Sequence, residues 1–167
     1  MEQTIRVRSA TVQDLDALSA LAVQVQELHA EGRPDLFRSA DEDELRRFLE
    51  ERIAAGSIVI VAQRADAEPE GYVFAEHIDR QESSFLLAHR SIYIHHIAVD
   101  RSARRSGIGD ALMDEIADRA REAGAATIRL DSWAFNSEAH SFFAAQGFAP
   151  SRQVFERLLD ENAATPG

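Results

Sequence analysis

The feature that most restricts the fold is a strand that passes through a short loop into a long helix, within residues 91–124. Ile92 to Val99 is rich in β-branched residues and favours a strand. From Gly107 to Ala123, apolar residues recur every four positions, which is typical of an amphipathic helix, and Gly124 can cap its end. Strands followed by helices are typical of proteins in which a sheet is covered by helices. We therefore expect an α/β chain.

The loop between this strand and this helix, Asp100 to Asp110, has the properties of a phosphate site. Gly107 and Gly109 allow the backbone to approach a ligand, and the free amides of the first helical turn point at it. The partial positive charge of a helix N-terminus favours an anion there. Three of the five loop residues from 101 to 105 are arginines, although the whole chain has a formal net charge of −11. The pattern suits a pyrophosphate; solvated arginines beside a glycine turn are the alternative interpretation.

The remaining pattern predicts a mixed sheet with helices on both faces. Ser57 to Ala62 is a continuous apolar run, which indicates a strand covered on both sides. The expected strands are 5–7, 57–62, 71–77, 92–99, 127–133 and 153–159, and the expected helices are 11–32, 41–56, 107–123 and 136–147. The stretch from 79 to 90 is ambiguous because Phe85-Leu86-Leu87 interrupts polar residues; we interpret it as a lid or as a contact in a homodimer.

Composition narrows the class of protein. Without repeats or linkers, the 167 residues predict a single domain over 1–160 and a frayed tail at 161–167. The absence of cysteine excludes disulfides, thiolate metal sites and cysteine nucleophiles, and we expect no metal. No apolar run is long enough for a membrane span, so we expect a cytoplasmic protein. The excess of 29 acidic over 18 basic residues disfavours nucleic acid and anionic lipid and favours protonated amines.

Two motifs resemble the GNAT superfamily of acetyltransferases. Ile97-Ala98-Val99-Asp100 followed by Arg104-Arg105-Ser106-Gly107-Ile108-Gly109 resembles its strand–Arg/Gln-x-x-Gly-x-Gly/Ala–helix motif. The second motif begins at Leu130 to Asn136 and continues with Ala139, Phe142, Phe143, Gly147 and Phe148. The resemblance implies a central mixed, mostly antiparallel sheet with helices on both faces.

The resemblance also implies acetyl-CoA as the cosubstrate. Its pantetheine arm would pair with the exposed backbone of the central strand, as in strand addition to a sheet edge. That backbone is Ile97, Ala98 and Val99, and Asn136 would hydrogen-bond the arm. The pyrophosphate would lie on Arg104, Arg105, Ser106, Gly107, Ile108, Gly109 and Asp110. The family's usual tyrosine acid is replaced here by Phe143, which we place beside the cofactor.

Acetyl transfer requires a base, because an alkyl amine with a pKa near 10 is protonated at neutral pH. His95 is the preferred candidate, since a histidine base lies four residues before the matching valine in one branch of the family. His96 is a second histidine candidate, Glu76 is the alternative from a neighbouring strand, water is a further candidate base, and Tyr93 or water would replace the missing acid. In a regular strand Tyr93, His95 and Ile97 share one face and His96 lies on the other, unless a bulge intervenes.

The acceptor would lie near the first two helices. Charged and aromatic residues gather there, and the predicted substrate residues are Glu31, Phe37 and Trp133, with Phe135 a further lining candidate. The expected function is transfer of an acetyl group to a primary amine of a small molecule or peptide. Because Phe143 removes the usual acid, the alternative is a non-catalytic acyl-CoA sensor, and a nucleotide-binding domain is a third interpretation.

Overall fold

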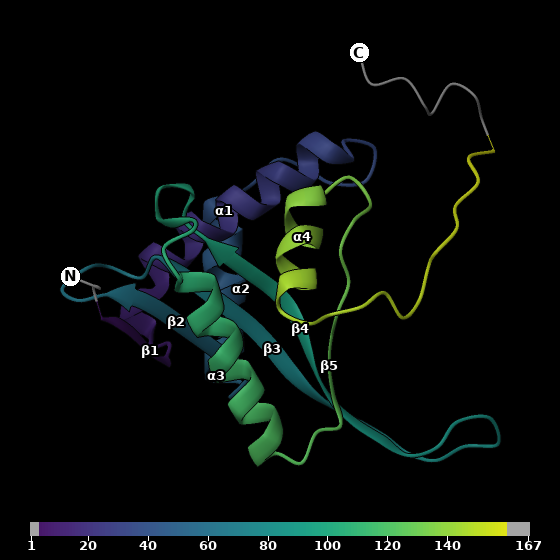
Figure 1. The fold of residues 1–167 in the computed structure, drawn as a ribbon. Helices are drawn as coiled ribbons and strands as arrows, with labels where there is room; N and C mark the ends of the chain where they lie inside the picture. The colour runs from purple at the N-terminus through teal and green to yellow at the C-terminus, as the bar shows by residue number, and fades with distance from the viewer. Residues whose placement is uncertain (1–3, 160–167) are drawn as a thin grey trace.

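A computed structural model describes residues 4–159 of the protein and shows one five-stranded sheet between two pairs of helices (Figure 1). The strands lie side by side in the order of the sequence, and all neighbours are antiparallel except β4 and β5, which are parallel. The strands are β1 (Ile5–Ser9), β2 (Ile58–Arg64), β3 (Gly71–Arg80), β4 (His89–Val99) and β5 (Thr127–Leu130). The mixed, mostly antiparallel sheet expected from the sequence is confirmed.

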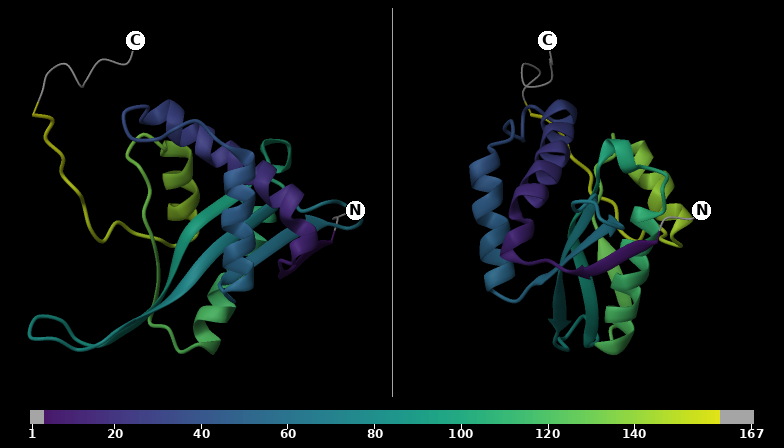
Figure 2. Two further views of the ribbon diagram at one scale, coloured as in Figure 1. Left: turned by 180° about the vertical axis from the view of Figure 1, so that it is seen from behind. Right: turned by 90° about the vertical axis from the view of Figure 1, so that its left-hand side faces the viewer.

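Two helices cover each face of the sheet (Figure 2). Helices α1 (Leu15–Gly32) and α2 (Glu42–Ala54) lie on one face, and α3 (Ile108–Glu122) and α4 (Ser137–Ala145) lie on the other. Short 3-10 turns precede α1 (η1, Val12–Asp14) and follow β4 (η2, Arg101–Ala103). The four helices expected from apolar periodicity are therefore present, with ends within a few residues of their predicted caps.

The strands place alternate side chains into two apolar layers. On β2, Ile58 and Ile60 pack beneath α3, and Val59 and Val61 pack beneath α1 and α2. All five residues from Ile58 to Ala62 are buried, as the continuous apolar run predicted. The sheet is consequently fixed by apolar packing on both faces.

A partly buried ion pair stabilises the start of α1. Asp14 accepts hydrogen bonds from the Arg8 guanidinium at 2.7 and 2.8 Å and from the Thr11 amide at 2.8 Å. The hydrogen bond from Arg8 is the main reason that the pKa of Asp14 is lowered. Thr11 and Asp14 therefore form a capping box that is anchored to β1 by Arg8.

The strand expected over Gln153–Leu159 is not formed. Residues 151–159 extend away from the sheet (Figure 1), with exposed side chains throughout and no strand beside them. A strand needs a partner for its backbone groups, and within residues 4–159 this segment has none. The strand prediction for this segment was therefore wrong for the isolated chain. The predicted tail at 161–167 lies outside the described residues.

The ambiguous stretch between 79 and 90 is the end of a long β3–β4 hairpin. Its turn, residues 81–88, projects beyond the sheet and is exposed throughout (Figure 1). Phe85 is 94% exposed and Leu87 is 78% exposed, so these apolar side chains find no cover in residues 4–159.

Candidate active site

Strand β4 contains one residue more than the facing part of β3, and this residue is His95. Phe74 lies opposite His96 and Ala75 lies opposite Ile94, so His95 has no partner on β3. A bulge of this kind interrupts the alternation of side chains by one position.

The bulge places three polar side chains of β4 on one face of the sheet. Tyr93 pairs with Glu76, and His96 with Phe74, on the face covered by α1 and α2, whereas Ile97 packs towards α3. His95 contacts the same face, because its ring stacks on Phe74 with centroids 4.8 Å apart. The regular alternation expected from the sequence, in which His96 pointed away from His95, is therefore corrected by the bulge.

His95 and Glu76 form a hydrogen-bonded pair. The Nε2 atom of His95 lies 2.8 Å from Oε2 of Glu76, and each side chain is about one-third exposed. Because a carboxylate accepts, Nε2 carries the proton in the neutral ring and Nδ1 keeps its lone pair. The ring of Tyr93 lies 4.9 Å from that of His95. The structure thus brings together all three predicted catalytic residues.

Tyr93 is a hydrogen-bond donor rather than a source of protons. Partial burial, together with hydrogen bonding to the carboxylate of Asp131, raises its pKa to about 12. Its phenol therefore stays protonated throughout the neutral range. Sequence reasoning missed Asp131 as its partner, because the contact requires the end of β5 to lie beside β4.

His96 is partly buried and neutral. Burial, with smaller repulsion from His95 and His29, lowers its pKa to about 4. Its Nδ1 atom lies 3.2 Å from the hydroxyl of Tyr72, which is fully buried, and its ring lies 5.7 Å from that of Phe48. His96 is therefore a packed and hydrogen-bonded core residue, whereas His95 is open to solvent.

Beyond the bulge, β4 and β5 separate. Their pairing ends where Ile94 meets Leu130, one residue before His95. From there to Val99, β4 is paired with β3 alone, so the backbone of Ile97, Ala98 and Val99 has one free edge. The expected strand over 127–133 ends early for this reason. A fork of this kind leaves backbone donors and acceptors available to an extended ligand.

The N-terminus of α3 lies beside the open end of this fork. Within the described chain, none of the seven backbone amides from Arg104 to Asp110 donates a hydrogen bond. Gly107 is the N-cap with φ +88°, and Arg105 also has a positive φ of 60°. Free amides at the end of a 15-residue helix form an anion site. This arrangement fits a pyrophosphate group.

The side chains of this loop differ in what they can offer a ligand. Arg105 is exposed and forms no ion pair with any residue from 4 to 159, and Arg104 is paired with Glu138 of α4 at 2.8 Å. Ser106 donates to the carbonyl of Ala103 at 2.5 Å. Ile108 is fully buried and Asp110 accepts from Gln146, so these two predicted residues can contribute only their backbone amides.

Helix α4 lies on the same face of the sheet as α3. Asn136 caps it by accepting from the amide of Ala139 at 3.2 Å, which leaves its side-chain NH2 group free to donate. Phe143 lies half-buried, with its ring centroid 5.6 Å from that of Phe142 and 5.8 Å from that of Phe148. No hydroxyl replaces the missing tyrosine at this position.

An aromatic cluster joins the end of α1 to the segment after β5. Phe37 stacks on His29 at 5.0 Å and meets Trp133 edge-on at 5.4 Å. The guanidinium of Arg33 lies 5.4 Å from the centre of the Trp133 ring. Two of the predicted substrate residues, Phe37 and Trp133, are therefore in contact. Glu31 is exposed on the last turn of α1 and forms no ion pair within the described chain.

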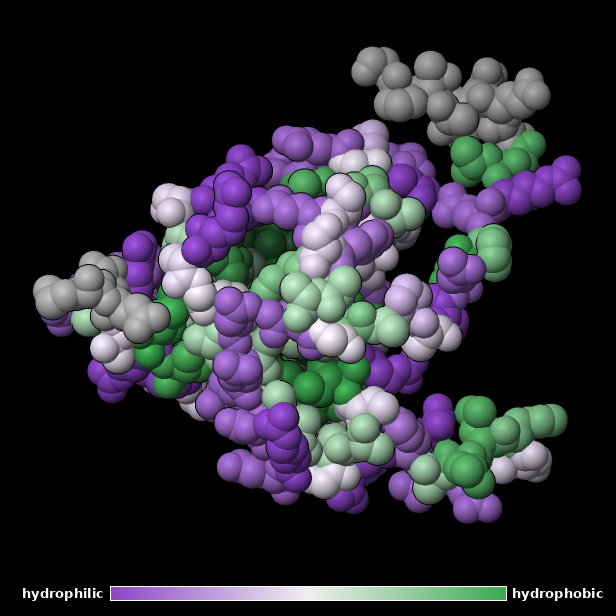
Figure 3. Space-filling view, in the orientation of Figure 1, coloured by the Kyte–Doolittle hydropathy of each residue, from purple (hydrophilic) through white to green (hydrophobic). Residues whose placement is uncertain are grey.

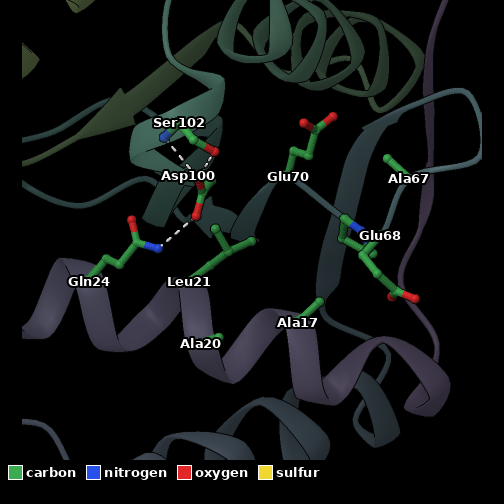
Figure 4. A pocket seen from close by; sticks show the side chains of 10 residues that line it. Ala17, Ala20, Leu21, Gln24, Ala67, Glu68, Glu70, Asp100 and Ser102 are labelled. Carbon is green, nitrogen blue, oxygen red and sulfur yellow. Dashed lines mark hydrogen bonds between the residues drawn. The ribbon is translucent and has the colours of Figure 1, made fainter.

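A small pocket of about 230 Å³ lies elsewhere, between α1, the β2–β3 turn and η2 (Figure 4). Asp100 at its wall accepts hydrogen bonds from Ser102 and from Gln24 (Figure 4), and the first of these is the main cause of its lowered pKa. Glu70, another wall residue, is paired with Arg64. None of the predicted catalytic residues lines this pocket, and its polar groups are largely satisfied. We therefore place the candidate site at the fork and His95.

Comparison with known proteins decides the family. The family model described as Acetyltransferase (GNAT) family matches residues 22–148. The protein belongs to the GNAT family. This match spans the bulge, the fork and the N-terminus of α3. No curated protein matches the sequence.

Several solved protein structures share the fold over nearly the whole chain. A tetramutant of the BH1408 protein from Bacillus halodurans is 25% identical, with a TM-score of 0.88 over 92% of this chain and 99% of that one. The aminoglycoside N-acetyltransferase AAC(6')-Iy in complex with CoA is 18% identical, with a TM-score of 0.73 over 96% and 98%. Glucosamine-6-phosphate N-acetyltransferase from Arabidopsis thaliana is 15% identical, with a TM-score of 0.64 over 95% and 100%.

Two further findings concern the GNAT domain as described. Residues 4–159 contain no group of three or more side chains suited to hold a metal ion. In the same range, no helix combines the length and apolarity needed to cross a membrane.

Proposed function

We propose that this GNAT protein transfers an acetyl group from acetyl-CoA to a primary amine of a small molecule or peptide, with His95 as the general base. The observation that carries the proposal is the position of His95. It stands on a bulge beside the fork and is held at 2.8 Å by Glu76, and its other ring nitrogen forms no hydrogen bond with residues 4–159.

Acetyl-CoA fits the fork and the α3 N-terminus. The free edge of Ile97 to Val99 would pair with the pantetheine amides, and the amides from Arg104 to Asp110 would bind the pyrophosphate. When bound, acetyl-CoA supplies a thioester that is open to nucleophilic attack. The backbone amide of Ala98 is the nearest candidate donor to the developing oxyanion.

The residues of this chain would then move one proton. Nδ1 of His95 takes a proton from the attacking amine, while Glu76 fixes the ring and stabilises its charged form. As the nitrogen–carbon bond forms and the carbon–sulfur bond breaks, the nitrogen releases its second proton through water to the departing sulfur. A thiol with a pKa of about 8.5 can leave as a thiolate and take its proton from water. Tyr93 holds its own proton too tightly to give it up and would act only by hydrogen bonding.

The amine would approach from the aromatic cluster. Trp133 and Phe37 offer apolar faces, and the carboxylate of Glu31 lies at the end of the same helix as His29. This combination suits a cationic amine with an apolar part. The molecule's net charge of −11 favours the same class of substrate.

The test is thiol release from acetyl-CoA with a panel of amines, followed with a thiol-reactive dye. The chain has no cysteine, so it adds no background signal. We expect release with one class of amine, a loss of at least about a hundredfold in His95→Ala, and unchanged affinity for acetyl-CoA. His77→Ala is the matched control, because His77 is an exposed histidine of β3 paired opposite Ile92, on the other face of the sheet. Normal turnover in His95→Ala would refute its role as base.

Binding can be tested separately from turnover. Arg105→Ala should weaken acetyl-CoA binding about tenfold, since a hydrogen bond to a charged group contributes roughly 1.5–3 kcal/mol. Arg121→Ala, near the opposite end of α3, should leave the affinity unchanged. Binding of acetyl-CoA without thiol release in the presence of any amine would favour a non-catalytic acyl-CoA sensor. That alternative is suggested by Phe143, which replaces the usual tyrosine acid. Binding of ATP in preference to acetyl-CoA would contradict both.

A further inference from the structure

The loop that offers the free amides begins at Asp100. This residue directly follows β4 and is the N-cap of η2, so it joins the free edge of β4 to the residues from Arg104 to Asp110. A shift of Asp100 would therefore move both stretches of backbone that we assign to acetyl-CoA. A site that binds through backbone groups needs such a joint to be fixed in advance, because ordering it on binding lowers the affinity.

Both carboxylate oxygens of Asp100 accept hydrogen bonds. Oδ1 accepts from the amide and the hydroxyl of Ser102, at 2.8 and 2.5 Å, within the loop itself. Oδ2 accepts from Nε2 of Gln24 at 2.8 Å, and Figure 4 shows these contacts together. Among residues 4–159, only the bond from Gln24 links this carboxylate to a different element of the fold, helix α1.

The side chain of Gln24 uses both ends of its amide at this place. While Nε2 donates to Asp100, Oε1 accepts from the backbone amide of Arg101 at 3.3 Å. A side-chain amide that donates to one residue and accepts from the next fits in one orientation only. No other hydrogen bond within the described part of the chain joins α1 to residues 100–110.

Apolar packing holds this loop on one side only. Ala103 is 1% exposed and lies in the core layer beneath α3. On the side of α1, the pocket of about 230 Å³ separates the helix from η2, and Gln24 and Asp100 stand at its wall (Figure 4). The hydrogen bonds of Gln24 therefore hold the loop where packed side chains do not.

The conformation of the loop also needs support from its surroundings. Arg105 has a φ of 60°, a left-handed conformation that is unfavourable for a residue with a side chain. Such a conformation persists only where the structure around it fixes the backbone. Amides that are already aimed at an anion then bind it without a further loss of conformational entropy.

We propose that Gln24 is a positioning residue of the acetyl-CoA site, which holds the start of the loop against α1 in the form that binds the pyrophosphate. This inference rests on the proposed function, because acetyl-CoA is the ligand. Gln24 acts through Asp100 and Arg101 and not by contact with the reacting atoms. Its loss should therefore raise the KM and the Kd for acetyl-CoA and leave kcat at saturating acetyl-CoA close to that of the wild type.

An exchange of donor and acceptor tests the contact directly. In Gln24→Glu two carboxylates face each other, and in Asp100→Asn two NH2 groups do, because the oxygen bonded to Ser102 stays in place. Each variant should weaken acetyl-CoA binding about tenfold, through loss of a hydrogen bond to a charged group. The double variant Gln24→Glu/Asp100→Asn has one donor and one acceptor again, with the net charge of the wild type, and should bind within about twofold of it. Calorimetric titration with acetyl-CoA measures the affinities.

A further variant removes the contact without adding a charge. Gln24→Ala should raise the Kd about tenfold, and alanine is compatible with the helix. Gln26→Ala is the matched control, because Gln26 also lies on α1 but donates to the carbonyl of Arg38 at 2.8 Å. Its affinity for acetyl-CoA should be that of the wild type. Circular dichroism checks that all variants keep their fold.

Unchanged affinity in Gln24→Ala would overturn the inference, and so would a double variant that binds no better than the single variants. Equal losses of affinity in Gln24→Ala and Gln26→Ala would point to general damage of α1 and would also overturn it. Weaker binding in Arg105→Ala but not in Gln24→Ala would remove this inference and leave the proposed function in place. A wild type without affinity for acetyl-CoA would overturn both.

Discussion

His95 depends on one neighbour for its role. Its ring is positioned by the hydrogen bond to Glu76 and by stacking on Phe74. Of these contacts, only Glu76 determines which ring nitrogen carries the proton. The family motif drew attention to His95, but the contact with Glu76 follows from the β3–β4 register, which a single sequence does not specify.

Glu76→Gln should therefore reduce turnover by roughly ten- to a hundredfold while leaving the acetyl-CoA affinity unchanged. The amide can donate to Nε2 and so favour the ring form in which Nδ1 carries the proton and cannot accept another. Steady-state kinetics with the responsive amine measures the effect as a fall in kcat. Glu122→Gln, an exposed residue of α3, serves as the control. Equal kcat values in the two variants would contradict the assignment.

The partly buried His96 predicts an acid sensitivity of the fold. Its pKa of about 4 lies below the value near 6.5 of an unfolded histidine. Between these values the unfolded chain binds more protons, so stability is complete above about pH 6.5 and falls as the pH drops towards 4. The loss should reach roughly 3 kcal/mol, because each pH unit between the two values corresponds to about 1.4 kcal/mol.

Urea unfolding at several pH values measures this slope. His96→Gln keeps an acceptor for the hydroxyl of Tyr72 but does not titrate, so its slope between pH 6.5 and 4 should be shallower. His29, whose pKa is also lowered by burial, and carboxylates with lowered pKa values such as Asp14 and Asp100 should supply the remainder. A variant with the wild-type slope would show that His96 is not the titrating group.

At the scale of elements, the strands and helices that have a clear apolar periodicity could be predicted from the sequence. The ends and pairing of strands that depend on a neighbouring strand could not. The apolar run from Ile58 to Ala62 and the repeat of α3 carry their own periodicity. The early end of β5 depends instead on the bulge at His95. The strand expected over 153–159 has suitable residues, but no strand pairs with it within residues 4–159.

The start of α3 rests directly on β3, and this contact permits a prediction. A methyl group at Gly71 would lie 2.7 Å from Cγ2 of Ile108 and 3.0 Å from the carbonyl oxygen of Ala98. Gly71→Ala should therefore lower the free energy of unfolding by roughly 1–3 kcal/mol. It should also weaken acetyl-CoA binding, because the displaced helix end carries the free amides. Thermal unfolding and calorimetric titration measure the two effects; an unchanged melting temperature would contradict the packing described.

At the scale of the whole molecule, the candidate site has contributions from β3, β4, the segment after β5, α1, α3 and α4. The family motifs pointed to the parts from β4, α3, the segment after β5 and α4. The contact between Phe37 and Trp133 joins segments almost a hundred residues apart. The two residues could be named as candidates from the sequence, but their contact could not be predicted.

A ligand that contacts the β4 backbone and the α3 N-terminus should stabilise the folded chain as a unit. Acetyl-CoA at about a hundred times its Kd should add roughly 2.7 kcal/mol to the free energy of unfolding. For a chain of this size, that corresponds to a rise of roughly 5–10 °C in Tm. Differential scanning fluorimetry measures the shift, and dephospho-acetyl-CoA, which retains the pyrophosphate, should give most of it. An absent shift would contradict the cofactor site.

The bulge at His95 has a genetic consequence. Without residue 95, the alternation along β4 is unbroken, because Tyr93, His96 and Ala98 already face α1 and α2 while Ile94, Ile97 and Val99 face α3. His95 is thus an insertion into a strand whose packing is complete without it. Loss of a single codon at this position would leave every core residue on its own face and would remove the proposed base. A change of one codon can therefore remove the proposed catalytic base while the packing of the sheet is kept.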